Sequence, residues 1–220
     1  MSSRPLASNV TTWVEEPRGG RDRGPRGLVR AWGEVIANPR RFFRNGVAPG
    51  DQAPGLVFGV VVAVCYVVGL LATGDATIPE TLPFAGGAGA LTTVFVFLAV
   101  GLVVAPATLH LLAALQTLLL VAFVSDRAGV SETVQVIAYA AAPCVLAGVP
   151  YPPLRLIMTL YGAVLLVVGV SVVHRTSLAK AALVTVVPSA LLFGYAFRGF
   201  VAAAAVIEWA ERVTGGLLVV

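Results

Sequence analysis

A run of forty-one residues without an ionised side chain, from Phe84 to Val124, restricts the fold of this chain more than any other feature. A second charge-free run, Gly55 to Thr73, has nineteen residues and extends about 28 Å as an α-helix. That length matches the hydrocarbon core of a bilayer, which is about 30 Å thick. The chain is 58% hydrophobic and 12% charged, about half the charged fraction of a soluble domain. The sequence therefore predicts an all-α, polytopic transmembrane helical bundle.

Five crossings are expected, over residues 55–73, 84–124, 131–149, 154–173 and 181–197. The run from Phe84 is ambiguous because, past its glycine-rich start, it would extend about 52 Å as one helix. Either it is one long helix kinked at Pro106, or Pro106 marks a turn between two crossings, which would bring the total to six. Ala105-Pro106-Ala107 lacks the polar residues of a tight turn. This favours the single long helix.

The stretch from Ser131 to Pro153 combines a helix start with an internal proline. Ser131 is a good N-cap residue, and Glu132 follows where the positive end of the helix dipole favours a carboxylate. No other ionised side chain occurs before the Val-Pro-Tyr-Pro-Pro exit. A membrane helix tolerates Pro143 because neighbouring helices can satisfy the backbone group that it frees. The stretch is therefore predicted to be a bent membrane helix.

Nine arginines lie between Arg4 and Arg44, which makes the N-terminal part strongly basic. Residues 1–24, rich in Ser, Arg, Gly and Pro, are predicted to form a loosely ordered arm. From Arg26, apolar residues recur at helical spacing on one face, which predicts an amphipathic helix ending at Asn38-Pro39. The chain thus divides into a basic cytoplasmic arm (1–54), a transmembrane domain (55–199) and a C-terminal interfacial tail (200–220).

Aromatic and arginine side chains gather around the end of this amphipathic helix. The residues expected to contact the membrane surface or a partner are Trp32, Arg40, Arg41, Phe42 and Phe43. Aromatic rings suit the acyl boundary of a bilayer and arginines suit phosphates. The alternative is that this segment packs on the bundle's own loops, and the two arrangements can coexist.

The charge distribution indicates the orientation and the class of partner. By the positive-inside rule the arginine-rich N-terminus lies in the cytoplasm of a multi-pass cell-membrane protein. A basic arm beside a membrane indicates anionic headgroups, and the arm lacks the interleaved aromatics and lysines of a nucleic-acid binder. An unidentified membrane or cytoplasmic protein is a further expected partner. Gly55 and Gly59 form one GxxxG pair, which leaves a homo-oligomer open.

Few side chains within the predicted crossings could carry chemistry. Away from their ends the crossings contain no Asp, Glu, Lys or Arg, the groups that mark a coupled transporter. His110 and Gln116 form a candidate polar intramembrane site, either as a proton relay or as an interhelical hydrogen-bonding pair. His174 ends a helix, where a partial positive charge is favourable. Because no catalytic motif or metal-ligand spacing occurs, we expect no enzyme activity and no cofactor.

Three groups of residues together resemble a known family. They are the segment WGEVIANPRRFF (Trp32–Phe43), the segment SETVQVIAYAAAPCVLAGVP (Ser131–Pro150), and the positions Tyr161, Gly169, His174, Ser177, Lys180 and Ala181. They resemble the Yip (Ypt-interacting protein) family of polytopic membrane proteins, in particular its prokaryotic, halophilic-archaeal branch. The resemblance implies five membrane helices, a cytoplasmic N-terminus and an outside C-terminus. It also implies that Tyr139, Pro143, Pro150 and Gly169 are a structural signature.

The resemblance implies less about function. Eukaryotic members are similar to trafficking factors that engage Rab GTPases and shape membranes, but a prokaryotic cell has no prenylated Rab partner. Our leading hypothesis is a non-enzymatic scaffold that organises the membrane or recruits a partner through its basic arm. The alternative is a channel or transporter subunit in which His110, Gln116 and Tyr139 line a polar path.

Overall fold

The computed structural model describes residues 13–14, 23–75 and 89–217, and every regular element in these ranges is helical. The α-helices are α1 (Pro25–Ala37), α2 (Pro39–Asn45), α3 (Ala53–Ala72), α4 (Gly89–Ala99), α5 (Ala105–Phe123), α6 (Val130–Ala140), α7 (Pro152–Val173), α8 (Leu178–Ser189) and α9 (Gly199–Leu217). Two π-helices, η1 (Val100–Val104) and η3 (Ala190–Ala196), and one 3₁₀-helix, η2 (Ala142–Gly148), interrupt them.

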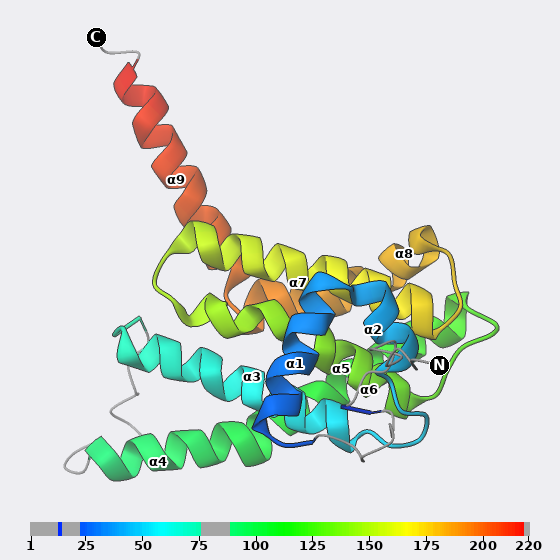
Figure 1. Cartoon of the computed structure of the whole chain (residues 1–220). Helices are drawn as coiled ribbons and strands as arrows, with labels where there is room; N and C mark the ends of the chain where they lie inside the picture. The colour runs from blue at the N-terminus through cyan, green and yellow to red at the C-terminus, as the bar shows by residue number, and fades with distance from the viewer. Residues whose placement is uncertain (1–12, 15–22, 76–88, 218–220) are drawn as a thin grey trace, which may run out of the picture.

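Within the described residues, four helices are long and apolar enough to cross a membrane. They cover Ala53–Ala72, Leu91–Phe123, Pro152–Val173 and Leu178–Ala196. A fifth crossing results if α6 and η2, which meet at an angle of 42°, are taken as one bent span. The all-α polytopic bundle expected from the sequence is therefore confirmed. Figure 1 shows α3, α4 and α7 extending in broadly the same direction.

The second of these spans is one continuous helix of 33 residues, from Leu91 to Phe123, which confirms the single long helix. Pro106 changes its local geometry. Proline has no N–H to donate to the carbonyl of Leu102, four residues earlier. The preceding turn widens into η1, where Ala105 N–H bonds the Val100 carbonyl, five residues back as in a π-helix.

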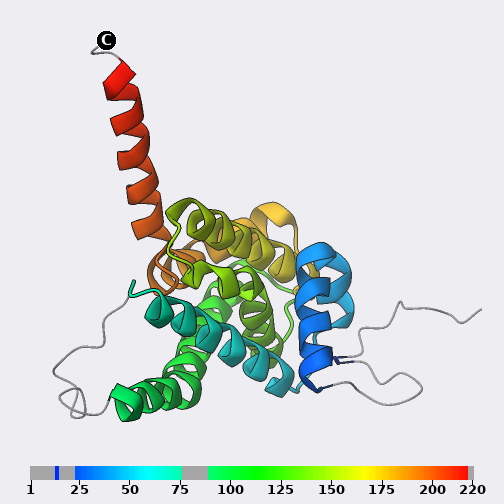
Figure 2. The ribbon, with the colours of Figure 1, turned by 60° about the vertical axis from the view of Figure 1, so that its left-hand side comes forward.

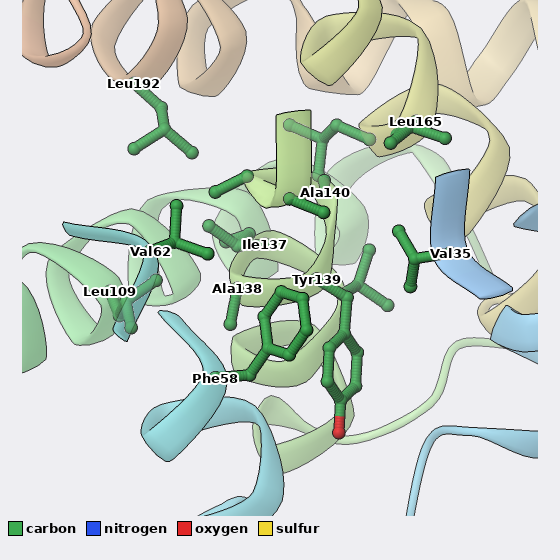
Figure 3. Close-up of a cluster of buried hydrophobic side chains, with 14 of the residues drawn as sticks. Val35, Phe58, Val62, Leu109, Ile137, Ala138, Tyr139, Ala140, Leu165 and Leu192 are labelled. Atoms are coloured by element: carbon green, nitrogen blue, oxygen red, sulfur yellow. The ribbon is translucent and has the colours of Figure 1, made fainter. Parts of the chain in front are cut away.

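The 3₁₀-helix η2 and α6 form the centre of the bundle, which we call the hub (Val130–Gly148). Every side chain from Thr133 to Cys144 is buried, as expected for a helix enclosed by others on all sides. Figure 3 shows side chains of α3, α5 and α7 gathered around Ile137 and Tyr139. Pro143 lies in η2, just after the bend. The helix begins at Val130 with Gly129 as the N-cap residue, so the N-cap expected at Ser131 is wrong by two residues.

α1 and α2 form a layer across one end of the bundle. In Figures 1 and 2, α1 runs across the direction of α3 and α7 and lies against the bundle near the start of α3. We call the end that carries α2, the α5–α6 connection and the α7–α8 connection the basic end. The opposite end, which we call the far end, carries Asp75 and the start of α7.

α9 extends from the far end away from the rest of the bundle (Figures 1 and 2). Its contacts with other elements are mainly with α7 and η3. Ile207 and Trp209 are exposed, as are the charged side chains of Glu208 and Glu211. The helix is not among the candidate spans of the described chain. Its mixed surface agrees with the surface helix expected for residues 200–220, which stays a prediction.

Candidate functional site

Two adjacent aromatic residues anchor α2 in the bundle. Phe42 and Phe43 are each 1% exposed. The Phe42 ring meets Tyr139 of α6 edge-on, with 4.9 Å between ring centroids. Phe43 lies over Gly169 of α7, where a Cβ atom would come within 2.9 Å of its ring. α2 packs on α7, and Phe42 reaches Tyr139 of α6, so both rings are enclosed by the bundle. This corrects the expectation that both rings contact a membrane surface or a partner.

Trp32 also turns toward the bundle. Its Nε1 donates to the carbonyl of Ala142 at 2.8 Å, at the junction between α6 and η2. From α7, the Tyr161 hydroxyl donates to the carbonyl of Ile36 at 2.5 Å, in the last turn of α1. The last carbonyls of a helix lack an intrahelical donor, so the Tyr161 hydroxyl satisfies the Ile36 carbonyl. Both bonds hold α1 on the bundle. The Trp32 indole nitrogen therefore bonds to the protein itself.

The outer side of the α1–α2 layer is basic. Its exposed arginines are Arg26, Arg30, Arg40 and Arg44. Arg41 is half-buried. Just before α1, Arg23 pairs with Asp51 at 3.2 Å, an exposed contact of the kind that adds little stability. The contact of Arg40 and Arg41 with anionic headgroups or a partner stays a prediction, now separated from the buried phenylalanines.

A polar groove of about 610 Å³ opens at the basic end beside α2. Its walls include Arg44, Val172 and Arg175, with Glu132 from the first turn of α6. One Glu132 oxygen accepts from the backbone N–H of Gly50 at 3.3 Å, so this carboxylate already has a partner. Arg175 also pairs with Asp126 at 3.8 Å, so Asp126 and Glu132 balance the charges of Arg44 and Arg175. The groove is therefore polar and close to neutral, and Arg44 is an exposed cation at the edge of α2.

His174 links the α5–α6 connection to the α7–α8 connection next to this groove. Its ring is fully buried; Nδ1 accepts from Ala128 N–H at 3.2 Å, and Nε2 faces the Thr133 hydroxyl at 3.4 Å. Because Nδ1 accepts, the neutral ring carries its proton on Nε2. Burial lowers the pKa of His174 from 6.5 to about 4, although the Glu132 charge partly opposes this. The helix end favours a positive charge on His174, but burial favours the neutral ring more strongly. The expectation of a partial positive charge there is therefore wrong.

Gln135 is a further buried residue at the basic end, and no local pattern in the sequence indicated its role. Its Oε1 accepts from Ala48 N–H at 2.9 Å, and its Nε2 donates to the Ala48 carbonyl at 2.7 Å. These two bonds tie the α2–α3 connection to α6. Gly55 packs against it so closely that a Cβ atom would lie 2.7 Å from Gln135. Gly59 meets Ala138 in the same way, so the GxxxG pair packs against α6 of its own chain.

Comparison of the sequence with models of protein families gives a match that covers most of these helices. The Yip1 domain model matches residues 33–213, from the middle of α1 into α9. The chain belongs to the Yip1 domain family. Neither a curated protein nor a solved structure matches it. The resemblance carried by Trp32–Phe43 and Ser131–Pro150 therefore identified the correct family.

The four residues that the resemblance implied as a structural signature lie in or beside the hub. Tyr139 is fully buried between Phe42 and Phe58, at 5.2 Å from the Phe58 ring centroid (Figure 3). Pro143 follows the bend, and Pro150 precedes the first turn of α7. Gly169 allows α7 to approach Phe43 closely. That these four residues form a structural signature of the family stays a prediction.

A tryptophan of the N-terminal arm also reaches the core of the Yip1 domain. Trp13 is 2% exposed, and its Nε1 donates to the Tyr139 hydroxyl at 3.2 Å. Residues 1–12 and 15–22 lie outside the described residues, so the loosely ordered arm expected there stays a prediction. An isolated tryptophan in a polar, arginine-rich segment was the available signal. This signal did not predict the role of Trp13, because no local feature indicates a partner 126 residues away.

His110 and Gln116 are not brought together. The His110 ring is exposed, and its Nδ1 lies 2.7 Å from the carbonyl of Pro106 in its own helix. Gln116 is fully buried on another face of α5, and its Nε2 donates to the Val184 carbonyl at 3.0 Å. Tyr139, the third residue of the suggested polar path, bonds Trp13 instead. These positions do not form a joint path in the described part of the chain.

A second charged cluster, also missed from the sequence, lies at the far end. Asp75 accepts from Arg155 at 2.5 Å and from Arg198 at 3.2 Å. Arg155 is only 4% exposed, and its Nε donates to the Ala147 carbonyl at 2.7 Å. We call these three residues, Asp75, Arg155 and Arg198, the far-end cluster. Within the described residues, no group of three His, Cys, Asp or Glu side chains could hold a metal ion.

Proposed function

We propose that this Yip1 domain protein is a non-enzymatic scaffold that binds anionic headgroups and recruits a cytoplasmic partner through its α1–α2 layer. One observation supports this most directly. Phe42, Phe43 and Trp32 hold the layer on the hub, while Arg26, Arg30, Arg40 and Arg44 remain exposed on its outer side. A rigid base with outward-facing guanidinium groups suits phosphate and carboxylate recognition, because each group can bind both oxygens of its partner.

The proposed orientation places the basic end in the cytoplasm of the cell membrane. Twelve of the fifteen basic residues belong to the N-terminal arm, the two connections of the basic end and the first turn of α8. The other three, Arg155, Arg198 and Arg212, belong to the far end, and two of them pair with Asp75. Positive loops stay on the cytoplasmic side. The polar groove would then offer Arg44, beside the Arg175–Asp126 pair, to an acidic segment of a cytoplasmic protein.

The prokaryotic, halophilic-archaeal branch is part of the proposal. Fourteen arginines against one lysine agree with a genome rich in GC. In such a cell the partner is not a prenylated Rab protein. The chemistry of the layer requires only that the partner present phosphate or carboxylate groups.

Crosslinking from the layer in living cells tests this function. A photoreactive amino acid replaces Val29, which is 64% exposed between Arg26 and Arg30, and the captured proteins and lipids are identified. We expect capture to fall at least tenfold when the four exposed arginines are all replaced by glutamine. A probe at Val213 on α9 is the matched control. Capture unchanged by the arginine replacements, or identical from Val213, would contradict the proposal.

Truncation of residues 1–50 is a poor substitute for this experiment. It removes Phe42 and Phe43 from the core, and loss of one buried phenylalanine costs about 3–5 kcal/mol. The arginine variants change only exposed side chains, so they separate recruitment from folding.

A further inference from the structure

An apolar crevice of about 160 Å³ lies between α3, α5 and the hub in the far half of the bundle. Both π-helices contribute to its walls, η1 through Val100 and Val104 and η3 through Leu192 and Ala196. A cavity of about this size can hold a benzene ring. Val104 is 53% exposed, so the crevice opens on the surface that faces lipid. In a membrane, the medium that fills such an opening is hydrocarbon.

Tyr66 brings one polar group into this apolar crevice. Its side chain is 6% exposed, and its hydroxyl has no hydrogen-bond partner within the described residues. The Tyr66 ring meets Phe197 edge-on, with 5.0 Å between centroids, which fixes its position. A buried hydroxyl without a partner is unfavourable. The group that satisfies it must therefore come from outside this part of the chain.

The far-end cluster places positive charge beside the same crevice. Arg198 directly follows Ala196 and Phe197, which line the crevice, and its backbone has a φ of 58°. Its guanidinium bonds both the carboxylate and the carbonyl of Asp75. Two guanidinium groups against one carboxylate leave one net positive charge, and Arg198 is 34% exposed.

We propose that this crevice binds one phospholipid from the leaflet at the far end. A short segment of one hydrocarbon chain of the lipid occupies the apolar crevice, and an ester or ether oxygen accepts the hydrogen bond of Tyr66. The phosphate lies beside Arg198, which carries the exposed part of the net positive charge. The apolar crevice, the Tyr66 hydroxyl and the Arg198 guanidinium follow one another in this order. A phospholipid presents its hydrocarbon chain, its ester or ether linkage and its headgroup in the same order. The site is separate from the α1–α2 layer and does not depend on the proposed scaffold function.

Native mass spectrometry and photo-crosslinking of the full-length protein test this site. The probe is phosphatidylglycerol with a diazirine in one acyl chain, and phosphatidylcholine serves for comparison. We expect one retained phosphatidylglycerol, crosslinked to residues of α3, η1 or η3. Tyr66→Phe keeps the ring and should lower retention about three- to tenfold, as expected for one hydrogen bond. Arg198→Gln should abolish the preference for phosphatidylglycerol over phosphatidylcholine.

Filling the crevice is the stronger perturbation. Ala63 lines it, and Ala63→Phe should lower both retention and crosslinking at least tenfold. Val68→Phe, on an exposed face of α3, is the control and should change neither. The proposal is overturned if crosslinks spread evenly over α4 and α5, or if Tyr66→Phe retains the lipid as the wild type does. Because Tyr66→Phe is nearly isosteric, it decides the question even if Ala63→Phe does not fold.

Discussion

The Gln116 amide donates to the carbonyl of Val184 at 3.0 Å, and this is the carbonyl that Pro188 leaves without a helical partner. In α8, the N–H of residue 188 would bond the carbonyl of residue 184, but proline has no N–H. Gln116 of α5 supplies the missing donor from a neighbouring helix. A proline break in one crossing is therefore compensated by an amide in another, as membrane helices require.

Gln116→Leu should lower the free energy of unfolding by about 1–3 kcal/mol, because it leaves a buried carbonyl unpaired. The same replacement in a Pro188→Ala background should cost less, since the introduced alanine restores the helical N–H. Equilibrium unfolding in mixed micelles gives the four free energies of this double-mutant cycle. Strict additivity of the two changes would show that Gln116 does not compensate for Pro188.

His174 should make the protein less stable as the pH falls from 6.5 towards 4. Burial lowers its folded-state pKa to about 4, so in this window the unfolded chain binds a proton that the folded protein does not. Stability is therefore present above pH 6.5 and is lost on acidification, by up to about 3 kcal/mol. His174→Gln should remove this part of the pH dependence, whereas His110→Gln, at an exposed ring, should keep it. Identical pH profiles for wild type and His174→Gln would contradict the assignment.

Gly169→Ala should destabilise the protein by about 1–3 kcal/mol, because the added Cβ overpacks the contact with Phe43 and Val136. Gly33→Ala on α1 is the matched control. Nothing lies within 4 Å of a Cβ at that position, so the change should stabilise the helix by about 0.5–1 kcal/mol. Thermal unfolding of both variants in one detergent measures the contrast. Equal effects at the two positions would argue against close α2–α7 packing.

Asp75→Asn should cost about 2–3 kcal/mol, since it leaves Arg155 buried without its counter-charge. The value is below the roughly 3–5 kcal/mol of a fully buried pair because Asp75 is 28% exposed and water screens part of the loss. The double variant Asp75→Asn with Arg155→Met should recover part of the stability by removing the buried charge. Equilibrium unfolding in mixed micelles compares the two variants. A double variant no more stable than Asp75→Asn would contradict this explanation.

The lengths of the charge-free runs predicted the spans well. Residues 55–73, 154–173 and 181–197 correspond to Ala53–Ala72, Pro152–Val173 and Leu178–Ala196. These runs are informative because bilayer thickness and complete backbone hydrogen bonding leave little choice but a helix of about twenty residues. The bend near Pro143 and the continuity past Pro106 also followed from local residue types.

The roles of single side chains depended on their distant partners. An aromatic pair next to arginines indicated a membrane surface, yet Phe42 and Phe43 contact α6 and α7. A histidine at a helix end indicated a positive charge, yet burial keeps His174 neutral. Gln135 and Arg155 showed no distinctive local pattern, and the isolated Trp13 gave no indication of its partner. Their importance comes from partners that the fold brings close.

By itself, the sequence determined that this chain is a helical membrane protein, because hydrophobic run length and turn chemistry are local properties. The motif residues and the match over residues 33–213 add the Yip1 domain family. Only the tertiary structure decided which arginines remain exposed, which aromatic rings are buried, and which carbonyl each polar side chain satisfies. Those outcomes depend on contacts between residues far apart in the chain, such as Gln116 with Val184 and Asp75 with Arg155. Such contacts leave no periodic pattern in the sequence.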